Sequence, residues 1–371
     1  MAFSFSFAGD DIEEDPQLEA APAPPQPVAR APAAASPSTA GAFPVQGKPL
    51  LPPTQHGLQE LLSRLPSKIA FSLLDVHLGD GRVLQLPRRE LWDVRVQLMA
   101  EDDADNASAS EAGLGEHDVK TGIYEGGFKS WESSVDLVKV LAAERVTDLL
   151  TQDPCVLIEL GCGTALPSLA LFRWALTGRK SDQEQPLVLT LADYNPTVLY
   201  LVTLPNLILA WALQERGENA AIEAAFTPDE ELELTLEVLE AFKQTLSSKR
   251  ITLSFLSGAW SLEFIDLLYG GGIPTGLPET TRTLLLGSET IYSPFALESF
   301  AETVLSILQR ERSGRSDGEA RALIAAKRLY FGVGGSLDDF VDKMRWLGTS
   351  VTTLFEETNG VHRGVVECLL S

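Results

Sequence analysis

Residues 155–169 read CVLIELGCGTALPSL, and this stretch decides the fold. It begins with a short apolar run, CVLIEL, which has the length of a buried strand. Gly161 and Gly163 follow, and LPSLALFRWALTG over residues 166–178 has the length of a helix that ends at Gly178. A strand, a glycine turn and a helix in this order begin the βαβ unit of a parallel sheet.

The same alternation continues toward the C-terminus. Asn195 and Pro196 suit the N-cap and first position of a helix that runs to about Glu215. Asn359-Gly360, between two β-rich runs, predicts a hairpin. Further strands are expected at 187–193, 251–260, 283–289 and 321–333, and helices at 296–311 and 336–348. We therefore expect an α/β fold with a mostly parallel sheet, helices on both faces and a C-terminal antiparallel β-hairpin.

Composition divides the chain into four segments, residues 1–17, 18–55, 56–116 and 117–371. The first is Phe-rich and then acidic, and the second is a Pro- and Ala-rich linker that we expect to be disordered. The third is an accessory region with a flexible acidic loop, and the fourth is the regular α/β domain. Within these segments we expect a helix in 56–65, strands in 82–87 and 91–100, and an acidic insertion at 218–248.

Charge and cysteine content exclude several classes of protein. The formal net charge of −23 disfavours a direct nucleic-acid site, because phosphate contacts need clustered Lys and Arg. It suits a basic protein partner, although solubility alone also explains it. Cys155, Cys162 and Cys368 lack paired spacing, which argues against disulfides and zinc, and the four histidines have no metal-ligand spacing. We expect no metal and a reducing compartment, the cytoplasm or nucleus.

A membrane location is not expected. The N-terminus is acidic and lacks the basic region of a signal peptide. The longest apolar run, VLYLVTLPNLILAWAL at residues 198–213, is short for a bilayer span and contains Pro205. We interpret it as a buried helix of a soluble, monomeric protein.

The glycine turn indicates a nucleotide-type cofactor. A dinucleotide-binding protein has a third glycine where this chain has Leu166, and Glu159 would repel a diphosphate. A carboxylate before the first glycine instead suits the cationic methionine part of S-adenosylmethionine. Asp193 ends the next strand, where it can accept both ribose hydroxyls. Gly258 and Trp260 follow a third strand and could flank adenine, although Trp260 is equally explained as a core residue.

Several motifs together resemble the histidine protein methyltransferases. These are YEGGFKSWESSVDLV (124–138), ELGCGTALPSL (159–169), DYNPTVLYLVTLPN (193–206), SGAW (257–260), SETIY (288–292) and AAKRLYFGVGG (325–335). The resemblance spans residues 117–371 and extends to the Phe-rich N-terminus. It departs at Glu159, where many relatives have Asp, at Ala165–Pro167 and at the acidic insertion.

The resemblance implies a class I, Rossmann-like, seven-β-strand methyltransferase sheet that uses S-adenosylmethionine. It also implies that the acceptor is one histidine in a large-subunit ribosomal protein of the L-three type, free or within a pre-ribosomal particle. By motif, the cofactor-binding residues would be Trp131, Glu132, Ser133, Glu159, Gly161, Cys162, Gly163, Asp193, Tyr194, Asn195, Gly258, Trp260 and Ser288.

The residues after the fourth strand of the regular domain are candidates for holding the acceptor. A histidine is already largely neutral at pH 7, so its methylation requires orientation and control of the tautomer rather than a strong base. We expect Glu289 and Tyr292 to fix the acceptor, and Tyr330 and Phe331 to wall its pocket. Alternatively, Glu289 only caps the following helix and Tyr292 only packs. Trp131 is likewise explained as a packing anchor.

Three other functions compete with this one. A protein-lysine methyltransferase of the same fold would share the cofactor site. A ribosome-assembly module could keep the fold without turnover. A nicotinamide dehydrogenase is disfavoured by the missing third glycine. The methylated ring nitrogen does not follow from the sequence, because it depends on fine placement of the acceptor.

Overall fold

The computed structural model describes residues 49–104, 126–144, 146–180, 185–315 and 317–370. All of them belong to one compact unit, residues 39–371. The predictions for the Phe-rich segment, for the linker up to residue 48 and for the acidic loop at 105–116 lie outside the described residues.

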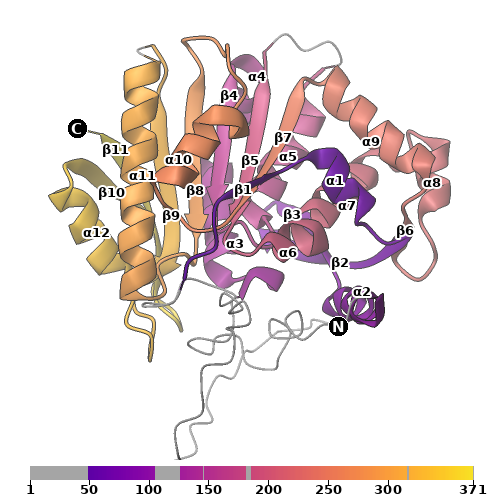
Figure 1. Cartoon of the computed structure of the whole chain (residues 1–371), viewed down its shortest axis with the longest axis horizontal. Helices are drawn as coiled ribbons and strands as arrows, with labels where there is room; N and C mark the ends of the chain where they lie inside the picture. The colour runs from indigo at the N-terminus through magenta and orange to yellow at the C-terminus, as the bar shows by residue number, and fades with distance from the viewer. Residues whose placement is uncertain (1–48, 105–125, 145, 181–184, 316, 371) are drawn as a thin grey trace, which may run out of the picture. The chain divides into compact units, whose positions relative to one another are not determined.

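A mixed eight-stranded sheet forms the centre of the described unit, in the order β1-β7-β5-β4-β8-β9-β11-β10 (Figure 1). The five strands from β7 to β9 are parallel, and β11 lies antiparallel to both β9 and β10. The strands are β1 (Thr54–His56), β4 (Cys155–Leu160), β5 (Leu187–Asp193), β7 (Ile251–Ser257), β8 (Arg282–Ser288), β9 (Ala320–Lys327), β10 (Thr349–Glu357) and β11 (Arg363–Leu370).

The seven strands from β7 to β10 form the predicted class I, Rossmann-like sheet with a C-terminal antiparallel hairpin. In chain order from β4 their positions read third, second, first, fourth, fifth, seventh, sixth. The chain order reverses beside β4, which pairs with β5 on one side and β8 on the other. In open α/β sheets a ligand binds at the carboxyl ends of the strands at such a point. β1 is an eighth strand that was not predicted: Thr54 and Gln55 fall in the predicted linker, and His56 falls in the predicted helix.

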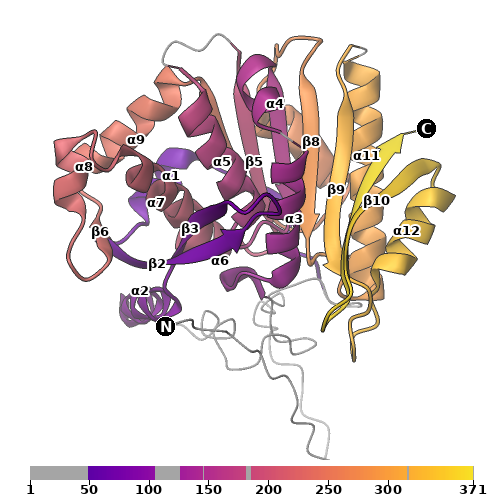
Figure 2. The ribbon, with the colours of Figure 1, turned by 180° about the vertical axis from the view of Figure 1, so that it is seen from behind.

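Helices cover both faces of the sheet, as predicted. Figure 1 shows α10 and α11 in front of the strands, and Figure 2, from behind, shows α3 and α5. Side chains of β4 alternate accordingly, with Leu157 in one core cluster and Val156 and Ile158 in the other. The helices that cover the sheet include α3 (Glu132–Ala143), α4 (Thr147–Gln152), α5 (Leu166–Gly178), α10 (Leu262–Leu267), α11 (Pro294–Gly314) and α12 (Leu337–Trp346).

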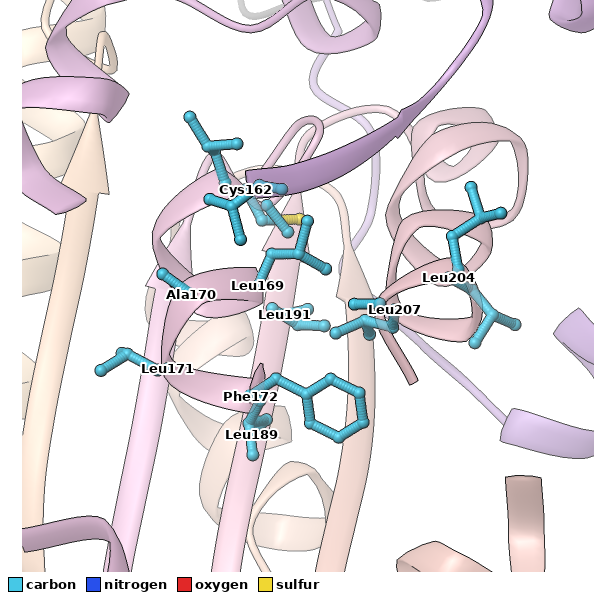
Figure 3. Close-up of a cluster of buried hydrophobic side chains, with 14 of the residues drawn as sticks. Cys162, Leu169, Ala170, Leu171, Phe172, Leu189, Leu191, Leu204 and Leu207 are labelled. Atoms are coloured by element: carbon cyan, nitrogen blue, oxygen red, sulfur yellow. The ribbon is translucent and has the colours of Figure 1, made fainter. Parts of the chain in front are cut away.

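The first helix after the glycine turn is held by a dense apolar cluster. Figure 3 shows Leu169 and Phe172 of α5 beside Leu189 and Leu191 of β5. All four side chains are fully buried. Phe172 and the leucines fix α5 against the sheet. This packing also fixes the glycine turn that precedes α5 at the carboxyl edge of the sheet.

The apolar run after Asn195 is a core helix, as predicted. It comprises α6 (Pro196–Val198), a π-helical turn (Leu199–Thr203) and α7 (Leu204–Glu215). Asn195 caps it, because its side chain accepts the Thr197 N–H. The continuous helix has 20 residues, which is long enough to span a membrane, so the prediction that this segment is too short for a bilayer span was wrong. However, 83% of its apolar window is buried inside the protein.

The N-terminal region differs from the prediction. Residues 91–100 are not a strand but part of α2 (Leu91–Ala104), and β2 (Lys68–His77) was not predicted. The valines and the alternation of apolar residues suggested a strand. However, Val94 and Leu98 are buried four residues apart, whereas Val96 is 57% exposed, which is the helical pattern. The predicted helix at 56–65 is α1 (Leu58–Ser63).

The acidic segment 218–248 is built into the fold. It forms α8 (Ala220–Ala225), β6 (Glu231–Glu233) and α9 (Leu236–Ser248). β6 joins β2 and β3 (Val83–Arg89) in a second sheet of three strands. Phe242 of α9 is fully buried and packs edge-to-face on Trp211. The apolar face of α9 therefore packs against α7.

Candidate functional site

A cavity of about 820 Å³ lies at the carboxyl ends of β4, β5, β8 and β9. Its volume is in the range of small-molecule sites, which is roughly 300–1,000 Å³. The cavity is where the reversal of strand order beside β4 predicts a ligand. Of the predicted site residues, those that line it are Trp131, Gly161, Cys162, Gly163, Asp193, Tyr194, Trp260, Ser288, Glu289, Tyr292, Tyr330 and Phe331.

The turn between β4 and α5 requires its glycines. Gly161 has φ of 67°, and a Cβ built there would lie 2.6 Å from Thr290 Cγ2. Gly163 has φ of 51°, and its Cβ would lie 3.1 Å from the Gly127 carbonyl oxygen. Left-handed backbone and the close neighbours both exclude larger residues. The backbone of the turn is thereby exposed to the cavity.

Asp193 closes this turn from the neighbouring strand. One carboxylate oxygen accepts the Gly163 N–H at 2.9 Å, and the other accepts the Asn195 N–H at 3.1 Å. Burial raises the pKa of Asp193 to about 6, although these backbone donors oppose the shift. Each oxygen keeps a further lone pair that can accept a ligand hydroxyl.

Glu159 lies beneath the turn and does not line the cavity. Its side chain is fully buried, and one oxygen accepts the Ser168 N–H at 3.0 Å. The other oxygen has no hydrogen-bond partner among the described residues. Burial raises the pKa of Glu159 to about 8. Because Glu159 accepts the Ser168 N–H, it fixes the first turn of α5 and thereby the glycine turn that precedes this helix.

Four other predicted residues also lie outside the cavity wall, for separate reasons. Asn195 caps the helix that follows it. Gly258 faces the N-terminal segment, since a Cβ there would lie 2.5 Å from the Pro52 carbonyl oxygen. Glu132 is exposed in the first turn of α3, and Ser133 is fully buried behind the cavity wall. Ser133 still acts on the site through a hydrogen bond to Glu289.

The segment before β1 covers the end of β7. The Ala259 N–H donates to the Leu51 carbonyl oxygen at 3.0 Å, and the Leu51 N–H donates to the Tyr194 hydroxyl at 3.1 Å. Leu51 also packs with Tyr194, Ala259 and Tyr292. Tyr292 therefore belongs to the wall near β5 and β7, on the side of the predicted adenine and ribose contacts.

Two polar atoms at the cavity wall fit a bound cofactor. The Trp260 indole nitrogen and the Thr290 hydroxyl are buried without a hydrogen-bond partner among the described residues. Buried polar groups are normally paired, so each indicates a partner supplied by a ligand or water. Together with the glycine turn and the Asp193 carboxylate, these atoms fit an adenosine-type group.

Glu289 lies in the cavity lining directly after β8 (Arg282–Ser288). The Ser133 hydroxyl donates to one carboxylate oxygen at 2.5 Å, and the Tyr330 hydroxyl donates to the other at 2.6 Å. Its φ of 57° is left-handed, a strained conformation for a residue with a side chain. Burial raises the pKa of Glu289, and the charge of Lys327 opposes this increase.

Tyr330 and Phe331 follow β9 rather than lying within it. The predicted strand 321–333 ends at Lys327, and Gly332 and Gly334 with φ of 80° and 83° form the loop that follows. Tyr330 is buried, and burial raises its pKa well above the usual value. Phe331 is 88% exposed at the rim of the cavity.

Lys327 lines the cavity but was not predicted as a site residue. Its ammonium lies 5.0 Å from the centre of the Trp131 ring and 5.8 Å from that of Tyr330. It ends a buried strand, and a charged residue in that position was the signal that could have revealed it. Thr290, Lys129, Arg328 and His362 also line the cavity without having been predicted.

Cys162 lines the cavity but does not suit nucleophilic chemistry. Burial raises the pKa of its thiol well above the usual value, and its sulfur lies 3.7 Å from the Thr203 hydroxyl. Among the described residues, no group of three His, Cys, Asp or Glu side chains could hold a metal ion.

No family model matches the chain, but whole proteins do. Histidine protein methyltransferase 1 of Saccharomyces cerevisiae is 35% identical over 358 residues, which cover 92% of this chain and 89% of that protein. The chain belongs to the histidine protein methyltransferase 1 family. It is therefore an S-adenosylmethionine-dependent protein-histidine methyltransferase, and the resemblance predicted from motifs is confirmed.

A second relative agrees with this family. Histidine protein methyltransferase 1 of Schizosaccharomyces pombe is 33% identical over 316 residues, covering 83% of this chain and of that protein. A solved magnesium protoporphyrin IX methyltransferase from Synechocystis with bound SAM is 12% identical, with a TM-score of 0.30, covering 75% of this chain and 98% of that one. The fold assignment rests on the strand order of the sheet.

The cavity of this histidine methyltransferase has two chemically different walls. The wall formed by the glycine turn, Asp193 and Trp260 presents backbone, carboxylate and indole groups that suit adenosine and methionine. The wall formed by Glu289, Tyr330 and Lys327 presents a fixed carboxylate, a phenol and a cation. The first wall can hold a methyl donor, and the second can hold an acceptor side chain.

Proposed function

We propose that this enzyme methylates one imidazole nitrogen of a histidine in a basic protein of the large ribosomal subunit, of the L-three type. We place the reaction in the cytoplasm and nucleus. The resemblance in motifs and the formal charge of −23 support a basic partner, since opposite charges steer association.

The observation that carries this proposal is the fixed carboxylate of Glu289. Hydroxyls of Ser133 and Tyr330 hold its two oxygens, so the remaining lone pairs have defined directions. A carboxylate in this position can accept the N–H of one ring nitrogen and leave the other nitrogen free. The geometry therefore suits selection of an imidazole tautomer.

The chemistry requires alignment above all. S-adenosylmethionine supplies a methyl group bound to a sulfonium sulfur. The free imidazole nitrogen forms the new N–C bond as the C–S bond breaks, and the electron pair of the C–S bond stays on sulfur. The positive charge passes to the ring, which then loses its N–H proton toward Glu289 or water. In-line displacement needs a held nucleophile, which the acceptor wall provides.

Mass spectrometry of the methylated product tests this function. The full chain is incubated with labelled S-adenosylmethionine and large-subunit ribosomal proteins, and the modified residue is located. We expect methylation of histidine. Methylation of lysine would support the alternative lysine methyltransferase, and cofactor binding without transfer would support the assembly module.

Substitution of Glu289 tests its proposed role. We expect Glu289→Gln to lower kcat on the order of 10²-fold, because the amide no longer accepts from both hydroxyls and from the acceptor. Cofactor affinity by calorimetry should stay unchanged. Tyr330→Phe should show a smaller loss of the same kind. Tyr292→Phe is the comparison on the other wall, where a change in cofactor affinity is expected instead. An unchanged rate for Glu289→Gln would remove this carboxylate from the mechanism.

A further inference from the structure

Lys327 places a positive charge in the acceptor wall. Its ammonium lies against the faces of Trp131 and Tyr330, at 5.0 and 5.8 Å from the ring centres. Such contacts hold a cation without neutralising it. Among the described residues, no ion pair joins this ammonium to a carboxylate at salt-bridge distance. Its charge therefore acts on the cavity.

The same cation is coupled to Glu289. The charge of Lys327 opposes the increase that burial causes in the pKa of Glu289. A chain of two hydrogen bonds also links the two residues. The backbone N–H of Lys327 donates to the Tyr330 hydroxyl at 3.3 Å, and that hydroxyl donates to Glu289. The carboxylate and the ammonium therefore belong to residues that line the same cavity, where their charges partly compensate each other.

Other charged groups also lie near this pair. Glu132 acts on Glu289 and Tyr330 from the exposed first turn of α3. Arg328 also lines the cavity and is paired with Asp338 and Glu356. Further titratable or charged groups in the cavity lining are Lys129, Asp193 and His362.

We propose that Lys327 selects a neutral imidazole over a protonated amine as the methyl acceptor. This inference rests on the proposed function and adds the residue that separates histidine from lysine. A buried carboxylate alone would attract a lysine ammonium and could take its proton. With Lys327 beside it, an incoming ammonium meets a like charge, whereas a neutral imidazole meets none.

The test compares Lys327→Met with Lys327→Arg in the full chain. The substrates are the large-subunit ribosomal protein and the same protein with its methylated histidine, located by mass spectrometry, replaced by lysine. Loss of the charge in Lys327→Met should raise the lysine rate relative to the histidine rate by about tenfold. Lys327→Arg keeps the charge and should keep the wild-type ratio.

The pH profile of histidine methylation provides a second measurement. A nearby cation disfavours imidazolium, so it lowers the pKa of the bound acceptor and keeps the ring neutral to lower pH. The acidic limb of kcat in Lys327→Met should therefore lie about one pH unit higher than in the wild type. A residue with a purely structural role would not move this limb.

Three outcomes would overturn this inference. An unchanged ratio and limb in Lys327→Met would remove the selective role. A tenfold loss of cofactor affinity by calorimetry with an unchanged ratio would assign the ammonium to the carboxylate of the cofactor. Equal behaviour of the Met and Arg variants would show that charge is not the cause. If the wild type itself methylates no histidine, it is the proposed function that fails.

Discussion

At the scale of single residues, the two carboxylates of the site, Asp193 and Glu289, have different hydrogen-bond partners and suit different ligands. Asp193 accepts the backbone N–H groups of Gly163 and Asn195, and Glu289 accepts the hydroxyls of Ser133 and Tyr330. Asp193 is buried and Glu289 is half-buried, and loss of water contact is the largest cause of the increase in the pKa of each. Their partners differ, so one carboxylate suits ribose hydroxyls and the other suits an imidazole N–H.

Cofactor affinity should depend on the charge of Asp193. Its pKa is raised to about 6, so the carboxyl becomes protonated as the pH falls below that value. A protonated carboxyl has fewer lone pairs for ribose hydroxyls, and we expect the Kd for S-adenosylmethionine to rise about tenfold between pH 7 and pH 5. Calorimetry at several pH values measures this. Asp193→Asn should bind more weakly at pH 7 and lose the dependence; a dependence retained in that variant would contradict the assignment.

At the scale of elements, the segment from Leu51 to β1 secures the end of β7. Its backbone bonds to Ala259 and to the Tyr194 hydroxyl, and β1 pairs with β7. The left-handed Gly258, with φ of 102°, lets Pro52 approach. This glycine is thus a packing requirement of the wall, behind the residues that line the cavity.

We expect Gly258→Ala to lower the free energy of unfolding by about 3 kcal/mol, from backbone strain and from the clash with Pro52. Gly217→Ala is the matched control, because Gly217 has a similar φ of 88° and no atom within 4 Å of the added Cβ. It should cost only about 1 kcal/mol. Urea unfolding of both variants gives the difference. Equal losses would show that strain alone acts.

At the scale of the whole molecule, net charge bears on the partner. The formal charge is −23 over 371 residues. Exposed charges attract a basic protein over a distance that salt shortens to about 8–10 Å at physiological strength. Apolar Leu329, Phe331 and Val361 border the cavity and are exposed, so local contacts can act beside this long-range attraction.

The KM for the proposed basic ribosomal substrate should therefore rise with salt. Between 50 and 300 mM NaCl we expect an increase of about fivefold, because screening weakens association of opposite charges. Steady-state kinetics measures it. The Kd for S-adenosylmethionine serves as the control and should change little, because its contacts are made at short range within the cavity. A KM that does not respond to salt would show that apolar contacts dominate recognition.

Much of the fold could be predicted from local pattern. The strands at 155–160 and 187–193, the helix at 166–178 and the cap at Asn195 were predicted where they occur. Buried parallel strands are continuous apolar runs, and glycine or capping residues mark their ends. The prediction failed at α2, where alternating apolar residues imitate a strand but burial follows a helix.

The sequence by itself determined the strands of the sheet from β4 onward, the glycine turn and the family, because these depend on residue type and spacing along the chain. Only the tertiary structure decided that Ser133 and Tyr330 hold Glu289, that Lys327 faces the same wall, and that Gly258 faces Pro52. These partners are far apart in the chain. Glu289, Lys327 and Tyr330 meet because the parallel strands β8 and β9 bring their carboxyl ends to one edge of the sheet. Ser133 reaches Glu289 from α3, and Pro52 reaches Gly258 from the segment before the antiparallel strand β1. No local pattern encodes these juxtapositions.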